Sequence, residues 1–166
     1  VEKLKEINGN VGVAIVMEVK TGDVKAMVNM TKCADGNYYE IKNDAVSDLL
    51  EPGSVFKPAS LLVALDDGVV DTTYTVDTGC GVWDMYGAKM KDHNWARGGY
   101  QRISLPKCLE VSSNIGVSRI IDRFYSKNPE KFVQGLKRVG MGIDLGLPFK
   151  GAAKAQIRAP LKGNPR

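Results

Sequence analysis

A serine and a lysine, Ser54 and Lys57, stand three residues apart directly before a strongly apolar segment. Residues with this spacing share one face of a helix, so a helix that begins near Ser54 places the Lys57 amine beside the Ser54 hydroxyl. A serine hydroxyl is a poor nucleophile at neutral pH. A partly desolvated amine can accept its proton and activate it toward a carbonyl carbon. The pair therefore predicts a serine nucleophile with a lysine base.

The surrounding sequence strengthens this interpretation. Ser-x-x-Lys alone is a weak pattern, since any helix with a serine N-cap and a surface lysine matches it. Here residues 59–65, Ala-Ser-Leu-Leu-Val-Ala-Leu, are apolar almost all the way round, which predicts a buried helix over 54–66 whose start lies at an internal cleft. Pro58 lacks the N–H that would bond the Ser54 carbonyl, so we expect an irregular first turn.

A second constellation, Ser112-Ser113-Asn114, follows some tens of residues later. An isolated Ser-Ser-Asn is by default a helix-end cap. Ser-x-x-Lys followed by Ser-x-Asn, however, is the signature order of the penicillin-recognising serine acyltransferases. The wider match covers Glu-Pro-Gly-Ser-x-Phe-Lys-Pro at 51–58, Ser-Ser-Asn-x-Gly at 112–116 and Gly-Met-Gly-Ile-Asp-Leu at 140–145. With these motifs the chain resembles the transpeptidase domain of class B penicillin-binding proteins, and Glu51 favours the division-type branch.

The resemblance implies a role for each matching residue. Ser54 would be acylated by the D-Ala-D-Ala end of a peptidoglycan stem peptide or by a β-lactam, and Lys57 would accept its proton. Ser112 would relay that proton toward the leaving amine. Asn114 would hydrogen-bond the substrate amide and help to fix Lys57. The Ser54 backbone N–H would form half of an oxyanion hole.

The third motif of the family, Lys-Thr/Ser-Gly, follows Ser-x-Asn, whereas the Lys-Thr-Gly of this chain, at 20–22, precedes Ser54. Alternating apolar runs at 13–17 and 24–28 flank it, so we interpret it as a hairpin turn. We therefore expect residues 1–166 to be a partial transpeptidase domain that stops before the third motif and the later strands of the sheet. Such a chain, taken alone, is expected to be a weak or inactive acyltransferase.

The expected fold is α+β, a partial penicillin-binding-protein/β-lactamase-like fold. It comprises an N-terminal β-hairpin at about 11–29 and a helical lobe at about 54–138. Residues 37–40 are expected in a long connection, and 68–99 in a turn-rich stretch. Ser104 resembles an N-cap with Pro106 in the first turn that follows.

Two alternatives stay open. A serine β-lactamase must also activate water to hydrolyse the acyl-enzyme, and no acidic residue after Asn114 lies in a family-like deacylation motif. A non-catalytic β-lactam-sensing domain would keep the nucleophile helix without turnover.

Composition fits one globular unit of 166 residues with 43% hydrophobic content. The net charge of +4 is mild and does not argue for nucleic acid. Three scattered cysteines indicate neither a disulfide scaffold nor a zinc site, and the sequence indicates no cofactor; Cys108 is expected to be a small buried side chain. The resemblance implies a bacterial envelope location through an anchor outside this chain. It also implies peptidoglycan stem peptides and β-lactams as ligands, and cell-wall synthesis or division proteins as partners.

Overall fold

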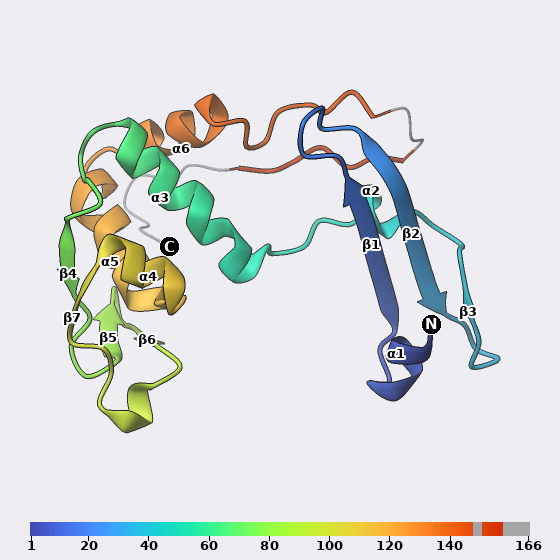
Figure 1. Ribbon diagram of the computed structural model, residues 1–166, viewed down its shortest axis with the longest axis horizontal. Helices are drawn as coiled ribbons and strands as arrows, with labels where there is room; N and C mark the ends of the chain where they lie inside the picture. The colour runs from blue at the N-terminus through green and yellow to red at the C-terminus, as the bar shows by residue number, and fades with distance from the viewer. Residues whose placement is uncertain (148–150, 158–166) are drawn as a thin grey trace. The chain divides into compact units, whose positions relative to one another are not determined.

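The computed structural model describes residues 1–147 and 151–157, which form two compact units. Among the described residues, unit 1 comprises 1–50 with 144–147 and 151–154, and unit 2 comprises 51–143 with 155–157. The predicted α+β class is confirmed, with an N-terminal hairpin in unit 1 and a helical lobe in unit 2 (Figure 1). None of the helices within the described ranges is long and apolar enough to cross a membrane.

Unit 1 is built on a three-stranded antiparallel sheet in the order β1-β2-β3 (Figure 1). Its elements are α1 (Glu2–Glu6), β1 (Val11–Met17), β2 (Val24–Lys32), β3 (Tyr38–Tyr39) and α2 (Asp44–Ser47). The β1–β2 register runs from Val11 opposite Thr31 to Val16 opposite Ala26. The alternating apolar residues of the two runs thus predicted the hairpin correctly.

The turn of this hairpin contains the Lys-Thr-Gly of residues 20–22. The Glu18 N–H donates to the Asp23 carbonyl at 2.9 Å, and the Gly22 N–H donates to the Glu18 carbonyl at 2.8 Å. The Thr21 hydroxyl also donates to the Glu18 carboxylate at 2.7 Å. These local bonds account for the motif as turn chemistry, as predicted.

The prediction of a long connection through 37–40 missed a short strand within it. Tyr38 and Tyr39 pair with Lys32 and Thr31 as strand β3. Aromatic residues favour a pleated surface, and a two-residue strand has too little alternation to be found from sequence.

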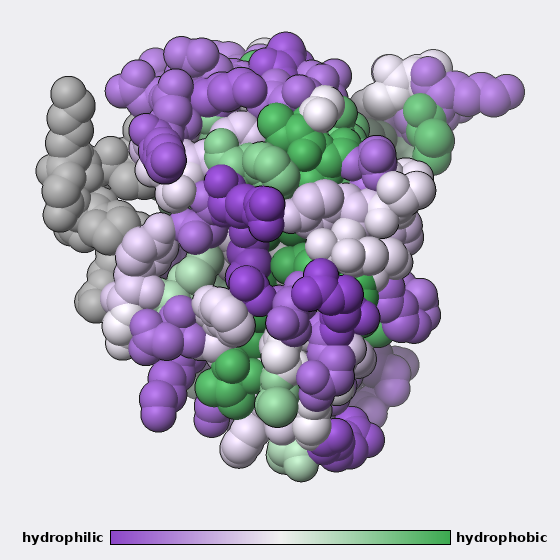
Figure 2. Space-filling view, turned by 90° about the vertical axis from the view of Figure 1, so that its left-hand side faces the viewer, coloured by the Kyte–Doolittle hydropathy of each residue, from purple (hydrophilic) through white to green (hydrophobic). Residues whose placement is uncertain are grey.

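Unit 2 contains the remaining elements. These are η1 (Gly53–Phe56), α3 (Lys57–Asp66), β4 (Thr75–Asp77), β5 (Val82–Met85), β6 (Ala88–Lys91), η2 (Trp95–Arg97), β7 (Arg102–Ser104), α4 (Leu105–Glu110), α5 (Asn114–Tyr125) and α6 (Pro129–Arg138). Strands β4 and β7 pair antiparallel, as do β5 and β6. The core lies among α3, α4, α5 and α6, with Leu61, Val63, Cys108, Ile120 and Leu136 at most 2% exposed. Figure 2 shows the molecule from the left-hand side of Figure 1. This face is mostly hydrophilic, with smaller hydrophobic patches between polar side chains.

One predicted helix start agrees with the structure and one differs. The Ser104 hydroxyl caps α4 by accepting from the Lys107 N–H, as expected. The helix predicted over 54–66 instead begins as the 3₁₀ turn η1 and becomes α-helical only at Lys57. Pro58 is the reason: without its N–H the Ser54 carbonyl cannot make an α-helical bond, and the Lys57 N–H bonds to it instead. The helix is also not buried all round, since Leu62 is 49% exposed.

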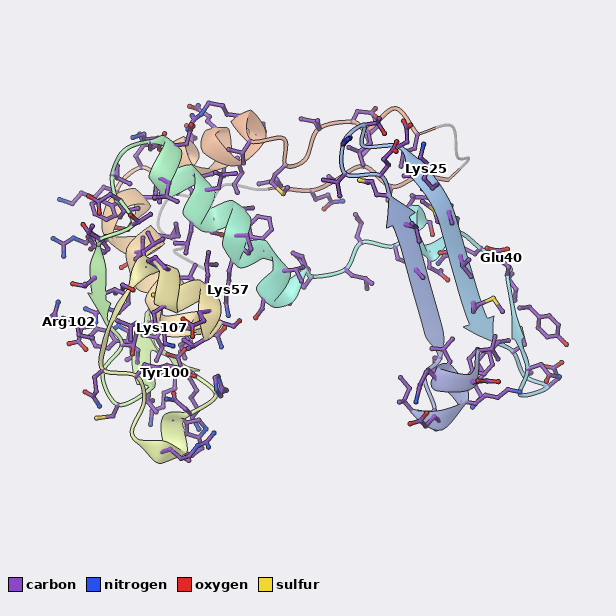
Figure 3. All side chains as sticks on the ribbon, in the orientation of Figure 1. Lys25, Glu40, Lys57, Tyr100, Arg102 and Lys107 are labelled. Carbon is purple, nitrogen blue, oxygen red and sulfur yellow. The ribbon has the colours of Figure 1, made fainter. Side chains whose placement is uncertain are left out.

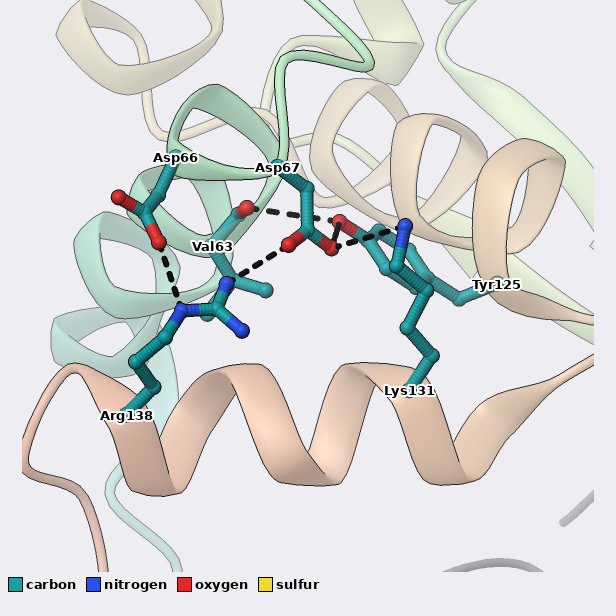
Figure 4. Close-up of polar contacts among 6 residues, drawn as sticks. All are labelled: Val63, Asp66, Asp67, Tyr125, Lys131 and Arg138. Atoms are coloured by element: carbon teal, nitrogen blue, oxygen red, sulfur yellow. Dashed lines mark hydrogen bonds and ion pairs between the residues drawn. The ribbon is translucent and has the colours of Figure 1, made fainter.

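A cluster of polar side chains holds the C-terminal end of α3 against α5 and α6 (Figure 4). Asp67 accepts from the Tyr125 hydroxyl at 2.8 Å and from the Arg138 guanidinium at 2.7 Å, and Lys131 lies 3.4 Å from its carboxylate. Arg138 also bonds Asp66 at 2.8 Å. Burial raises the pKa of Asp67, but the hydrogen bonds and the two cations outweigh it and hold the pKa below its usual value. The cluster thus stabilises the fold only while Asp67 is ionised.

We expect Asp67→Asn to lower the free energy of unfolding at pH 7 by about 1–3 kcal/mol, because the buried Tyr125 hydroxyl and the Arg138 guanidinium lose a charged acceptor. The folded-state pKa lies below the unfolded value of about 3.9, so this stabilisation is present above that pH and is lost as pH falls through the folded pKa. Urea unfolding between pH 7 and pH 2.5 should therefore show wild type and variant converging in acid. Asp66→Asn is the matched control, with a smaller effect because that side chain is 48% exposed. Equal effects of the two substitutions would contradict this account.

Helices α3 and α6 approach closely at Gly135, where an added Cβ would lie 2.4 Å from Val63 Cγ1. We expect Gly135→Ala to lower the free energy of unfolding by about 1–3 kcal/mol through overpacking. Val63→Ala should remove the clash, so the double variant should be less destabilised than the sum of the single variants. Strict additivity in a urea-unfolding cycle would show that this contact is not the cause.

Candidate active site

Three of the four predicted site residues meet in unit 2. The Lys57 Nζ lies 3.0 Å from Ser54 Oγ, 2.9 Å from Ser112 Oγ and 2.6 Å from the Ser112 carbonyl oxygen. In Figure 3 the Lys57 side chain extends from the N-terminal part of α3 toward α4 and α5. An ammonium group has three N–H donors, and each has an acceptor here. The amine thus joins the start of α3 to the turn between α4 and α5.

The backbone before α3 presents Ser54 at an exposed position. Gly53 has a φ of +60°, in the left-handed region where glycine is favoured, and it opens η1. The Ser54 N–H lies in the first turn of this helix, where no intrahelical acceptor exists. The start of η1 therefore sets the direction of the Ser54 N–H, which makes no hydrogen bond within the helix.

Ser112 occupies the turn that ends α4, in a conformation unusual for serine. Its φ is +51°. The Ser113 N–H donates to the Cys108 carbonyl at 2.8 Å and the Ser112 N–H to the Leu109 carbonyl at 3.0 Å, which is the bonding pattern of a Schellman motif. Glycine is the common residue at this position. A serine here carries a conformational cost in exchange for a hydroxyl directed at Lys57.

Opposing effects set the proton affinity of Lys57. Partial burial disfavours the ammonium and lowers its pKa, while the negative charge of Asp92 raises it. Burial is the larger effect, so the pKa lies below the ordinary lysine value. A lowered pKa is what a lysine needs to accept a proton from a neighbouring hydroxyl.

Asn114, the first residue of α5, is exposed and makes a different contact from the one expected. Its Nδ2 donates to the Lys91 carbonyl at 2.9 Å. The contacts that fix Lys57 come from Ser54 and Ser112, not from Asn114, because the side chain of Asn114 is held by the end of β6.

The sequence did not single out Asp92, which the structure places next to this turn. Its carboxylate accepts from the Ser113 hydroxyl at 2.7 Å and from the Ile115 N–H at 3.1 Å. The two partners lie 21 and 23 residues further along the chain, and no local pattern connects them. The one available signal was Ser113, whose position as a potential N-cap indicated a polar contact at the start of the following helix.

Other chemistry is not indicated in the described part of the chain. Residues 1–147 and 151–157 hold no group of three or more His, Cys, Asp and Glu side chains that could bind a metal ion. Cys108 is fully buried, as predicted, and burial together with the charge of Asp92 raises the pKa of its thiol to about 11. It is therefore a packing residue rather than a nucleophile.

We expect Ser112→Gly to be more stable than Ser112→Ala by about 1 kcal/mol, because both lose the hydroxyl and only glycine tolerates the positive φ without strain. The two midpoints of urea unfolding, measured side by side, test this difference. Equal midpoints would mean that the backbone of Ser112 relaxes on substitution.

Known proteins resemble this chain over most of its length. A family model described as the penicillin binding protein transpeptidase domain matches residues 12–164. The probable peptidoglycan D,D-transpeptidase PenA of Neisseria flavescens is 29% identical over 153 residues, covering 89% of this chain and 36% of that protein. The peptidoglycan D,D-transpeptidase FtsI of Escherichia coli K12 is 33% identical over 143 residues, covering 82% and 23%.

Solved structures show the same likeness. A crystal structure described as a peptidoglycan glycosyltransferase from Burkholderia ambifaria has a TM-score of 0.78 and 29% identity, and the match covers 95% of this chain and 45% of that one. The transpeptidase domain of Burkholderia pseudomallei penicillin-binding protein 3 has a TM-score of 0.77 and 28% identity, with 95% and 42% covered. The chain thus spans 23% to 36% of the length of the two curated relatives. It belongs to the penicillin-binding protein transpeptidase domain family.

Proposed function

We propose that this chain is part of a peptidoglycan D,D-transpeptidase, in which residues 1–166 form part of the transpeptidase domain and Ser54 is the nucleophile. The contact of the Lys57 amine with both Ser54 and Ser112 is the observation that carries the proposal. It brings a nucleophile, a base and a second hydroxyl together from segments 55 residues apart.

Acylation begins with Lys57 in its neutral form. In that form its lone pair can accept from the Ser54 hydroxyl, whose oxygen lies 3.0 Å away, and its two N–H groups can donate to the carbonyl and hydroxyl oxygens of Ser112. Ser54 Oγ attacks the carbonyl carbon between the two terminal D-alanines as its proton moves to Lys57. The Ser54 N–H is one donor for the oxyanion that forms.

Collapse of this intermediate breaks the C–N bond and leaves the stem peptide esterified to Ser54. The departing D-alanine nitrogen needs a proton, and Ser112 Oγ, 2.9 Å from Lys57 Nζ, provides a path for it. The amine of a second stem peptide then attacks the ester, forms the cross-link and restores the Ser54 hydroxyl. A β-lactam enters the same step, but its leaving nitrogen stays tethered to the acyl group.

Asn114 has a binding role in this proposal. Its Nδ2 is held by the Lys91 carbonyl, which fixes the orientation of the amide plane. Its carbonyl oxygen can then accept from an amide N–H of the substrate. In the whole protein we further propose an envelope location and partners among cell-wall synthesis or division proteins.

We expect a fluorescent penicillin to label the longest natural chain that contains this sequence, and Ser54→Ala to abolish labelling. Lys57→Met should slow acylation by about 100-fold to 10,000-fold, the usual effect of losing a general base. Because the base must be neutral and its pKa is lowered, the rate should rise with pH through a value below the ordinary lysine pKa. Lys89→Met, at an exposed position on β6, is the control and should change nothing.

A chase with unlabelled penicillin separates the alternatives. A transpeptidase retains the label, whereas a serine β-lactamase releases it by hydrolysis. A chain that never takes up label, or one still labelled after Ser54→Ala, would contradict the proposed function.

A further inference from the structure

A buried carboxylate holds the turn between α4 and α5. Asp92 is 1% exposed, and its two oxygens accept hydrogen bonds from Ser113 Oγ and the Ile115 N–H. A buried charge is costly unless hydrogen bonds or opposite charge compensate it. Here the compensation comes from these two donors and from the positive N-terminal end of α5, a helix of 12 residues.

The contacts reach three successive residues of the turn. Ser113 Oγ donates to Asp92 and accepts from the Gly116 N–H at 2.8 Å, so the serine is fixed on both sides. The carbonyl of Lys91, the residue before Asp92, accepts from Asn114 Nδ2. The end of β6 therefore holds the side chains of Ser113 and Asn114, and Ser112 directly precedes them in the chain.

The charge of Asp92 also acts on the base of the proposed reaction. It raises the pKa of Lys57 against the effect of burial, and on α4 it adds to the burial that raises the pKa of Cys108. The other charged side chain at this strand end, Lys91, lies over the ring of Trp95, with Nζ 3.9 Å from the ring centre. The charge of Asp92 therefore partly offsets the effect of burial on the pKa of Lys57.

We propose that Asp92 is a positioning residue for acylation: its buried carboxylate fixes the turn of residues 112–114 against Lys57. The inference rests on the proposed function, since it takes Lys57 as the base. Asp92 does not touch the reacting atoms. It acts on the site through its hydrogen bonds to Ser113 and Ile115, and its charge, which raises the pKa of Lys57, is a secondary effect.

The test compares Asp92→Asn with Ser113→Ala in the longest natural chain that contains this sequence. Asp92→Asn removes the charge at nearly constant size, and Ser113→Ala removes one hydrogen bond while keeping the charge. Asp84→Asn is the matched control, because Asp84 lies on the paired strand β5 but is exposed. The readouts are the rate of acylation by a fluorescent penicillin from pH 5 to pH 11 and the titration of the Lys57 side chain by ¹³C NMR.

We expect both Asp92→Asn and Ser113→Ala to acylate about 10-fold to 100-fold more slowly at their own optimum pH, because the site loses alignment. Only Asp92→Asn should shift the acidic limb of the pH profile. Without the negative charge the ammonium is less favoured, so the pKa of Lys57 falls and the limb moves to lower pH. The control should match wild type in both measurements.

The outcomes distinguish the two proposals. If wild type is labelled at Ser54 but Asp92→Asn leaves the limb and the Lys57 titration unchanged, the charge role of Asp92 is overturned. If folded Ser113→Ala acylates at the wild-type rate, the geometric role is overturned, and this variant decides that point even where Asp92→Asn does not fold. If wild type is not labelled at Ser54, the proposed function fails, while the NMR titration still decides whether Asp92 acts on Lys57.

Discussion

The Lys57 amine is the contact on which the rest of the site depends, because it joins two segments 55 residues apart. A partly buried amine needs an acceptor for each N–H, and here all three acceptors belong to Ser54 and Ser112. Separation of α3 from the turn between α4 and α5 would therefore leave the Lys57 amine without its two acceptors on Ser112, while Ser54 would stay beside it. The same hydrogen bonds that satisfy the amine also assemble the site.

Two irregular turns make this meeting possible, and each has a local cause. Pro58 prevents an α-helical bond to the Ser54 carbonyl, so Ser54 sits on a 3₁₀ turn outside the regular helix. Ser112 adopts a positive φ at the end of α4, where glycine would be more favourable. In both places the chain departs from its preferred geometry where a hydroxyl must face Lys57, which is the pattern expected where function opposes local stability.

Local sequence determined the parts of this structure that could be predicted. The β1–β2 hairpin follows from alternating apolar residues, the start of α4 from the Ser104 cap, and the pairing of Ser54 with Lys57 from their spacing. The β5–β6 hairpin was missed because its turn is Tyr86-Gly87, with both residues at positive φ, rather than the usual Asn-Gly. Asp92 was missed for a deeper reason. Its burial and its bonds to Ser113 exist only once β6 has packed against α5, and no periodicity in the sequence encodes that packing.

Contacts at the C-terminal end of α3 also affect the position of Lys57, because the helix is rigid. A helix of 10 residues is about 15 Å long, and it transmits a shift at one end to the other because its backbone bonds allow little bending. At the C-terminal end, Asp67 is held by Tyr125 and Arg138, and midway along the helix Val63 packs against Gly135. These contacts fix where the N-terminal end, and thus Lys57, can lie relative to α5. Weakening these contacts should change the position of Lys57 and leave its proton affinity unchanged. Loss of the Asp92 carboxylate should change the alignment of the site and also the proton affinity of Lys57. The pH dependence of acylation therefore separates the two effects. Packing at the C-terminal end of α3 affects only the maximal rate, whereas the buried Asp92 carboxylate also affects the pH at which the rate rises.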